Sequence, residues 1–341
     1  MLGSNDSEQR DAPKPVAGHL ACFQDAIRYS AMSLSMSDAA QILTRNGHLS
    51  GNQWGDGTSW MNPVDDQATL ASDRRRAEWT ERVERYARDA APRTRPFAVA
   101  LVEHLPPPVG AHVLDVATGT GHVAVEAARR VGPGGSVLAT DFLPAWEPFV
   151  CATASAAGVG NVLFASMPAE ALALPDASFD VAYCQFGLMF VPEPQRALRE
   201  MRRVLRPGGR IGIAVWSVPE KVGLFLIPRI VAPALPPTTG EAPPSPMSMG
   251  APGLIEDLVA EAGFHDVVRH SVTISHDITD PELEWQQWRE NFAMPDGGGL
   301  ERLPAQVQQQ LHDDVIAAFM SFQAGDTVRV PSEAILVTAS R

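Results

Sequence analysis

The sequence predicts a doubly wound α/β domain, and two observations lead to that fold class. Short β-rich runs alternate with helical segments between residues 112 and 216. The runs are apolar at nearly every position, which is typical of parallel strands covered by helices on both faces. A parallel sheet with helices on either side is therefore expected for the middle of the chain.

The expected elements follow one another in a regular order. Five strands are predicted in this region, at His112–Val116, Ser136–Thr140, Asn161–Ala165, Phe179–Cys184 and Arg210–Trp216. Helices fit between them at His122–Arg130, Ala145–Ala157 and Gln195–Val204. The later part of the chain predicts a helix at Gly253–Ala262, a strand at Asp266–Ile274, helices at Leu283–Phe292 and Pro304–Phe322, and a last strand at Ala334–Ala339.

The amino-terminal part differs in composition. Residues 1 to about 20 are polar and rich in Gly, Pro and charge, and the stretch that follows shows one clear helix signal, at residues 38–45 behind Ser37. Residues 1–68 are therefore expected to form a partly flexible extension. Residues 69–110 are expected to form a helical cap. Trp79, Val83, Tyr86 and Ala90 recur there at helical spacing, on a helix predicted to end near Pro92.

The remaining boundaries follow from the same pattern. Residues 111–280 are expected to form the α/β domain, residues 281–323 an inserted helical lid, and residues 324–341 the terminal strand. Within the α/β domain, residues 233–252 form a loop with seven prolines. A loop of this length is either an active-site lid or a disordered excursion.

Charge and composition exclude several classes of function. The chain has 341 residues with 40 Asp and Glu against 27 Lys and Arg, and its net charge of −13 repels nucleic acids and anionic membrane surfaces. No apolar segment is long enough for a membrane span. The three cysteines lie too far apart for a zinc site or a disulfide framework, so no metal is expected and a reducing, cytoplasmic location is predicted. The expected partner is a small molecule.

The segment Val113–His122 carries the clearest chemistry. Asp115 ends a buried strand, and Gly119 and Gly121 allow a tight turn that a ligand can approach closely. Asp141, about 20 residues on, has acceptor positions for two ribose hydroxyls. Gly119, Gly121 and Ala124 also fit the dinucleotide fingerprint, and either aspartate could be a local cap. The turn alone therefore does not separate these alternatives.

Further motifs occur in a fixed order along the chain. They are Val137–Asp141, Ala169–Leu172, Pro175–Asp180, Cys184–Phe190 and Arg203–Arg210. With Asp115 and the glycine turn, residues 79–341 resemble class I S-adenosylmethionine-dependent methyltransferases, in particular the ubiquinone/menaquinone-biosynthesis-like group. The resemblance implies a Rossmann-like, seven-stranded sheet with an antiparallel last strand. It also implies methyl transfer from S-adenosylmethionine to a small organic acceptor, such as a quinone-like, phenolic or natural-product compound.

The resemblance also implies a set of site residues. The cofactor-binding residues would be Asp115, Ala117, Gly119, Gly121, Asp141, Phe142, Ala169, Glu170, Gln185 and Phe186. The acceptor pocket would include Trp79, Tyr86, Met189, Trp216 and Glu220, together with the lid. A general base is not assigned, and Glu220, His276 and His122 are its candidates.

Two positions depart from the family pattern. Ala117 stands where the family has glycine, and Pro168 stands where it commonly has an aspartate that accepts from the adenine amino group. Pro168 therefore leaves open a methyltransferase fold with another role, such as a cyclase or a binding module. An NAD-dependent oxidoreductase would explain the glycine turn but not the later motifs. The acceptor, the atom methylated and the oligomeric state are not predicted.

Overall fold

The protein was studied as a computed structural model, which describes residues 76–236, 245–292 and 299–341. The predicted extension at residues 1–68, with its helix at residues 38–45, lies outside the described residues. So do residues 237–244 of the proline-rich loop.

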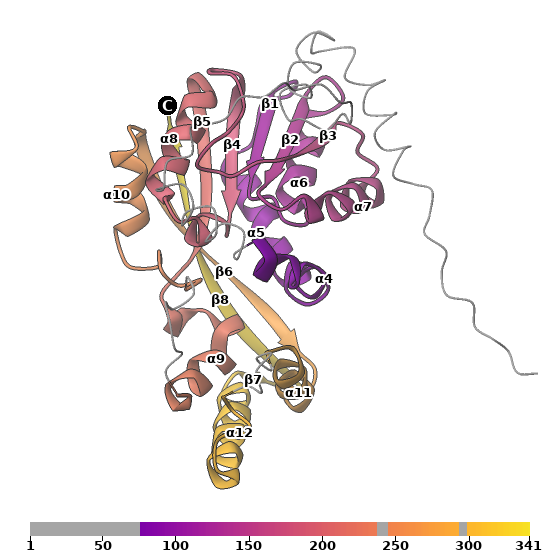
Figure 1. Ribbon diagram of the computed structural model, residues 1–341, viewed down its shortest axis with the longest axis vertical. Helices are drawn as coiled ribbons and strands as arrows, with labels where there is room; N and C mark the ends of the chain where they lie inside the picture. The colour runs from indigo at the N-terminus through magenta and orange to yellow at the C-terminus, as the bar shows by residue number, and fades with distance from the viewer. Residues whose placement is uncertain (1–75, 237–244, 293–298) are drawn as a thin grey trace, which may run out of the picture.

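A single twisted sheet forms the centre of the molecule (Figure 1). Its strand order is β3-β2-β1-β4-β5-β8-β6, and a short strand β7 pairs with β8 outside this order. The strands are β1 (His112–Val116), β2 (Ser136–Asp141), β3 (Val162–Ser166), β4 (Phe179–Gln185), β5 (Leu205–Trp216), β6 (His265–Ile278), β7 (Gln323–Ala324) and β8 (Thr327–Ser340). The first five are parallel, and β8 is antiparallel to both β5 and β6. The predicted α/β sheet with an antiparallel last strand is confirmed.

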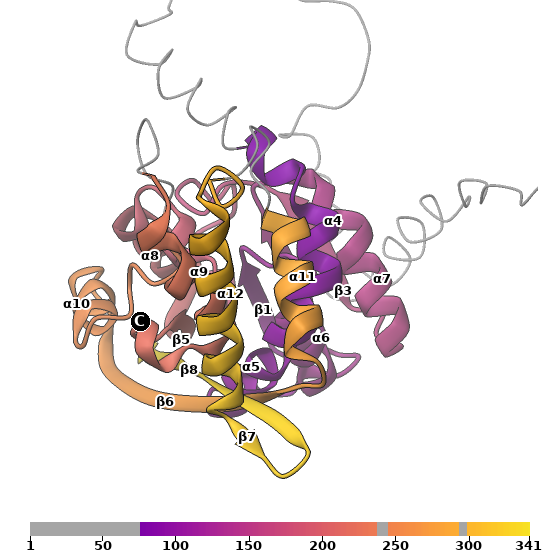
Figure 2. The same ribbon diagram turned by 90° about the horizontal axis from the view of Figure 1, so that it is seen from below.

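Helices cover both faces of this sheet. On one face α5 (Ala91–His104) contacts α6 (His122–Val131), which contacts α7 (Glu147–Ala157). On the other face α8 (Pro194–Val204) packs against α10 (Leu254–Glu261). Figure 2 shows the two groups on opposite sides of the strands. This arrangement leaves the carboxyl edge of the parallel strands available for a ligand.

The predicted end of a helix near Pro92 is wrong. The chain remains helical through α4 (Val83–Arg85), a wider π-helical segment η1 (Tyr86–Ala90) and α5. The Ala91 N–H donates to the Tyr86 carbonyl, five residues earlier, and Pro92 follows at the first turn of α5. Proline is tolerated at a helix start, since an N–H there has no partner within the helix, so the wide turn removes the penalty for Pro92.

Strands β6 and β8 are longer than the sequence predicts. Trp216, the last residue of β5, pairs with Ala334, so residues 327–333 of β8 continue past the end of β5 together with the end of β6. We call these paired ends of β6 and β8 the ribbon. Polar residues interrupt its apolar residues, so it contains no continuous apolar run that would predict a strand. The ribbon carries α9 (Leu226–Val231), α11 (Pro281–Phe292) and α12 (Ala305–Met320), which lie beyond the carboxyl edge in Figure 1.

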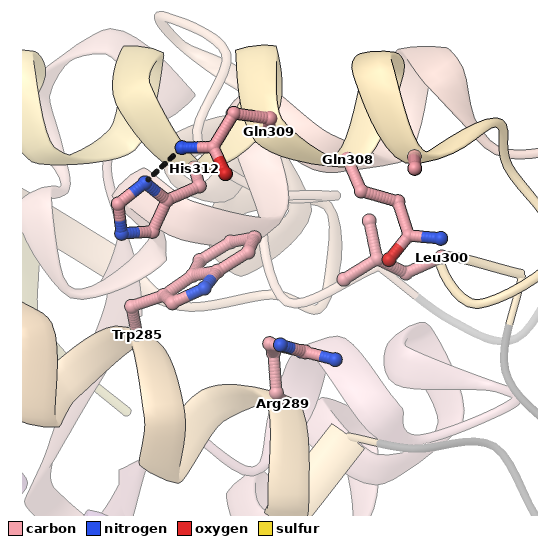
Figure 3. A pocket seen from close by; sticks show the side chains of 7 residues that line it. Trp285, Arg289, Leu300, Gln308, Gln309 and His312 are labelled. Atoms are coloured by element: carbon pink, nitrogen blue, oxygen red, sulfur yellow. Dashed lines mark hydrogen bonds between the residues drawn. The ribbon is translucent and has the colours of Figure 1, made fainter.

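These helices and the ribbon form a second hydrophobic core, which we call the lid core. Its fully or nearly buried members are Leu226, Ile227, Val231, Ile278, Trp285, Leu300, Leu311, Val315, Phe319, Val328 and Val330. Between α11 and α12 lies an open cavity of about 230 Å³, lined by Trp285, Arg289 and His312 among others (Figure 3). The inserted helices therefore pack as a unit on an extension of the sheet.

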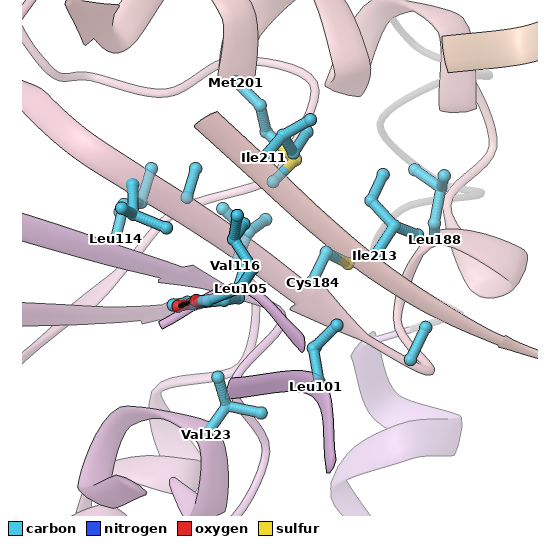
Figure 4. Packing of buried hydrophobic residues seen from close by; sticks show 14 of the residues in the cluster. Leu101, Leu105, Leu114, Val116, Val123, Cys184, Leu188, Met201, Ile211 and Ile213 are labelled. Carbon is cyan, nitrogen blue, oxygen red and sulfur yellow. Dashed lines mark hydrogen bonds between the residues drawn. The ribbon is translucent and has the colours of Figure 1, made fainter. Parts of the chain in front are cut away.

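The larger hydrophobic core, the main core, lies between the sheet and its covering helices. Leu101 of α5, Leu114 of β1 and Ile211 of β5 are completely buried within it (Figure 4). Each such side chain contributes about 1.5–3 kcal/mol of transfer free energy. This packing holds the ends of β1, β2 and β4 in a fixed relation, which positions the site.

Two of the later sequence motifs, Pro175–Asp180 and Arg203–Arg210, form hydrogen bonds and ion pairs with neighbouring elements. Asp180 accepts the His112 N–H at 2.8 Å and forms an ion pair with Arg206. Arg203 pairs with Asp176 and Glu200. The contacts of Asp180 and Arg206 lie at the amino edge of the sheet, so these two residues serve the fold rather than a ligand at the carboxyl edge.

Candidate functional site

The chain turns sharply at the end of β1. Ala117, Gly119 and Gly121 all adopt positive φ angles, of 56°, 52° and 83°. A Cβ added at Gly121 would lie 3.2 Å from Val150, so the turn packs against α7 there. A Cβ added at Gly119 would meet nothing within 4 Å. The turn therefore faces open space at Gly119, where a ligand can approach the backbone.

Asp115 lies beneath this turn and is almost completely buried. Its Oδ2 accepts hydrogen bonds from the Thr118 hydroxyl at 2.6 Å and from the Ala124 N–H at 3.0 Å. Burial raises the pKa of Asp115 to about 7, although both hydrogen bonds favour the ionised form. A ligand cation at this point would be strongly favoured.

Asp141 lies on the other side of the turn, at the end of β2. Its Oδ2 accepts the Gly119 N–H at 3.1 Å, and its Oδ1 accepts the Leu143 N–H at 3.2 Å. Burial raises the pKa of Asp141 to about 6. Asp141 therefore caps the loop that follows β2, through Leu143, and also accepts a hydrogen bond from the glycine turn, through Gly119. Two buried carboxylates flank the open space at Gly119.

Ala117 occupies a backbone conformation that favours glycine, which explains why the family pattern has glycine there. Its methyl group is accommodated by a second glycine. A Cβ added at Gly187 would lie 2.3 Å from the Ala117 Cβ, far inside van der Waals contact. Because residue 117 has a Cβ, residue 187 has to be glycine.

We expect Gly187→Ala to lower the free energy of unfolding by about 1–3 kcal/mol, as other overpacked cores do. Adding Ala117→Gly removes the opposing methyl group, so the double variant should recover most of that loss. Urea unfolding of the two single variants and the double variant measures the coupling. Strictly additive effects would show that the two positions are not in contact.

Asp141 is next to the turn that follows β3. The Met167 N–H donates to the Asp141 carbonyl at 2.8 Å, and Ala169 and Glu170 lie half-buried just beyond. Pro168 is exposed. Phe142, which follows Asp141, packs into a cluster around Trp146. The structure thus brings the predicted residues of this loop to the same edge as Asp141.

An aromatic cluster lies at the ends of β4 and β5. Phe186 stacks on Trp216 with ring centroids 3.9 Å apart, and Phe97 of α5 meets both rings edge-on. The Gln185 amide donates to the Thr94 carbonyl at 2.8 Å, which ties β4 to α5. Phe97 was not predicted as part of the site because the helix before it was expected to end near Pro92. The 3–4-residue spacing of Phe97, Ala98, Leu101, Val102 and Leu105 was the signal available.

The residues predicted for the acceptor pocket are only partly brought together. Trp79 contacts Phe190 with ring centroids 5.1 Å apart, Tyr86 contacts Trp146, and Met189 is buried. Glu220 is exposed in a short helix, η4 (Pro219–Lys221), on the chain that leaves β5. No described contact joins Glu220 to the carboxylates or to the aromatic cluster.

The two histidines proposed as bases differ in setting. His122 is the first residue of α6, and burial, assisted by the charge of Arg95, lowers its pKa to about 4. His276 was expected after the sixth strand but lies within β6, because that strand continues to Ile278. Burial, assisted by Arg93, also lowers the pKa of His276.

The described residues contain no group of three or more His, Cys, Asp or Glu side chains placed to hold a metal ion. Among the same residues, no helix combines the length and apolar character needed to cross a bilayer.

Comparison with known proteins identifies the domain. Residues 114–213, from β1 to β5, match the family model described as a methyltransferase domain. The α/β part of the chain is a class I S-adenosylmethionine-dependent methyltransferase domain. The methyltransferase domain is 43% identical over 111 residues to a ubiquinone/menaquinone biosynthesis C-methyltransferase of Hahella chejuensis, covering 32% of this chain and 45% of that protein.

A longer match exists to the nocamycin O-methyltransferase of Saccharothrix syringae, at 34% identity over 189 residues. It covers 51% of this chain and 66% of that protein, so the chain spans less than two thirds of either relative. Among solved structures, a putative methyltransferase of Bacillus halodurans aligns with 71% of this chain and 97% of its own, at 20% identity and a TM-score of 0.49.

The methyltransferase family uses S-adenosylmethionine as its methyl donor, and the residues present fit that cofactor. The space at Gly119 admits a ligand, and the two buried carboxylates match a ligand with a cationic amine and a ribose diol. The departure at Pro168 removes one acceptor for adenine but leaves Glu170 and the Ala169 backbone in the adjoining turn.

Proposed function

We propose that this methyltransferase-domain protein transfers the methyl group of S-adenosylmethionine to a small organic acceptor. The observation that carries the proposal is the pair of buried carboxylates, Asp115 and Asp141, on either side of a glycine turn that opens at Gly119. Both are held by backbone N–H groups before any ligand arrives. Such preorganisation lowers the cost of binding.

The cofactor supplies an activated methyl group on a sulfonium, so the protein has mainly to position the reactants and exclude water. Asp115 would hold the ammonium group, and Asp141 would accept the ribose hydroxyls. Phe186 and Phe142 would line the adenine and sulfonium region. Thr118 and Gly119 keep both carboxylates in place through hydrogen bonds within the turn.

For the acceptor, we infer a planar phenolic or quinone-like intermediate of natural-product metabolism. Trp79 and Phe190, which are half-buried with ring centroids 5.1 Å apart, would offer part of the flat, apolar surface that such a molecule needs. The names of the two relatives, one acting in quinone biosynthesis and one on nocamycin, support this class. We further propose a cytoplasmic protein that binds neither nucleic acid nor membrane, in keeping with its net charge of −13.

A specific observation disfavours an NAD-dependent oxidoreductase. In the usual dinucleotide-binding order, strand 6 follows strand 5 in a parallel sheet. Here the antiparallel β8 lies between β5 and β6. The sheet therefore departs from the dinucleotide type at the edge next to the aromatic cluster.

S-adenosylhomocysteine should raise the melting temperature, whereas NAD should not. A ligand at a hundredfold excess over its Kd adds about 2.7 kcal/mol to the free energy of unfolding. Differential scanning fluorimetry with both ligands measures the effect, and product mass with candidate phenols shows the added methyl group. A shift with NAD alone would favour the oxidoreductase. Cofactor binding with products of unchanged mass would favour a cyclase or binding module.

A further inference from the structure

His276 lies at the boundary between the two hydrophobic cores. Side chains alternate along a strand, so those of residues 272, 274, 276 and 278 face the same side of β6. Val272 and Ile274 pack against the main core, and Ile278 belongs to the lid core. His276 pairs with Val330, four residues before the Ala334 that faces the end of β5. Its imidazole is therefore just beyond the carboxyl edge.

The aromatic cluster connects His276 to the cofactor edge. The His276 and Phe97 ring centroids are 6.3 Å apart. Phe97 in turn meets Phe186 at 5.5 Å and Trp216 at 5.1 Å. These three rings are buried, whereas His276 is half-buried, so an acceptor just beyond the carboxyl edge would meet His276 at the margin of the cluster.

Among the residues that the structure describes, the imidazole of His276 has no hydrogen-bond partner. Its Nε2 is buried and unpartnered, and no hydrogen bond within the described residues involves its other ring nitrogen. Leaving a buried polar atom unpaired costs about 1–3 kcal/mol. Such groups in native proteins call for an explanation, and a catalytic role is one of the recognised ones. An acceptor hydroxyl bonded to this ring would supply the missing partner.

Burial keeps His276 neutral. The charged groups that act on it are Arg93 of α5, Asp277 of β6 and Glu284 of α11, and Arg93 and Glu284 form an ion pair at 2.6 Å. Burial and the Arg93 charge lower the pKa of His276, against the opposing effect of the two carboxylates. A neutral imidazole at neutral pH is able to accept a proton.

We propose that His276 is the general base of an O-methylation, accepting the proton of an acceptor hydroxyl. This inference rests on the proposed methyl transfer. The acceptor oxygen forms a bond to the methyl carbon while the carbon–sulfur bond breaks and its electron pair stays on sulfur. The hydroxyl proton passes to the imidazole and later to solvent. The acceptor is thus a phenol or enol rather than an amine or a carbon nucleophile.

The other candidate bases fit less well. Glu220 is exposed and separate from the aromatic cluster. Burial lowers the pKa of His122 to about 4, which makes it a weak base at neutral pH.

4-Nitrophenol tests the proposal without turnover, because its phenolate absorbs visible light and the phenol does not. The full chain, saturated with S-adenosylhomocysteine, is titrated with this probe between about pH 5 and pH 8. We expect wild type to lower the apparent pKa of the bound probe by about one unit relative to His276→Gln and His276→Asn, a tenfold change in phenolate. His270→Gln, on the same face of β6, is the matched control and should behave as wild type.

Equal probe pKa values in wild type and the His276 variants would overturn the proposal, as would the absence of a phenolate band in wild type. Loss of S-adenosylhomocysteine affinity in both His276 variants would also overturn it, since His276 would then support the cofactor site. Failure of wild type to bind S-adenosylhomocysteine is a separate result, which contradicts the proposed function itself.

Discussion

Asp141→Ala should weaken S-adenosylhomocysteine binding by a hundredfold or more. The carboxylate would lose two charge-assisted hydrogen bonds to the ribose, each worth about 1.5–3 kcal/mol. The substitution would also remove the acceptor of the Gly119 N–H, which donates to Asp141 Oδ2 at 3.1 Å. Isothermal titration calorimetry measures the loss.

Asp115→Asn is the informative comparison for this variant. The amide oxygen can still accept from Thr118 and Ala124, so we expect a loss of only about tenfold. Asp257→Ala, an exposed carboxylate on α10, controls for the change in net charge and should bind as wild type. Equal losses for Asp141→Ala and Asp115→Asn would show that the two roles are misassigned.

Cofactor affinity should rise steeply with pH across the neutral range. In the ligand-free protein the pKa of Asp115 is about 7 and that of Asp141 about 6, against an ordinary value of 3.8. The ligand's ammonium and hydroxyl donors favour the ionised carboxylates, so binding must release protons below these pKa values. Affinity at pH 5 should be about a hundredfold or more below that at pH 8, since each unit of pKa is a factor of ten.

Asp115 and Asp141 make the free energy of unfolding fall, rather than rise, with increasing pH. Their folded pKa values lie above the unfolded ones, so the folded state binds more protons between about pH 4 and pH 7. Their contribution to the free energy of unfolding is present below about pH 4 and is lost as the pH rises through 6 and 7. Calorimetry in two buffers of different ionisation enthalpy detects the proton release. Binding with no proton release at pH 6 would contradict this electrostatic description.

The parallel strands and the glycine turn were predictable because each depends on local sequence. A run such as His112–Val116 is apolar on both faces only in a covered strand, and Gly119 and Gly121 mark the turn directly. A helical cap was predicted for residues 69–110, but its helix was expected to end near Pro92, so the continuous helix into α5 was not predicted. The π-helical turn η1, which allows the helix to continue to Pro92, could not be predicted because no residue pattern specific to it occurs at Tyr86–Ala90.

The lid and its ribbon depended on long-range packing. Polar and apolar side chains alternate over residues 327–330, and the strand over residues 327–333 forms only because β6 pairs with it. For the same reason His276 was placed after a strand rather than within one. The contact between Ala117 and Gly187 was likewise hidden, since the two positions are 70 residues apart and meet only in the fold.

A crystal structure with S-adenosylhomocysteine bound tests the central claim most directly. We expect the ligand over the Gly119 turn, with both ribose hydroxyls within hydrogen-bond distance of the Asp141 carboxylate and the ammonium group beside Asp115. A ligand bound elsewhere, or a ribose held by other residues while Asp141 bonds only Gly119 and Leu143, would contradict it.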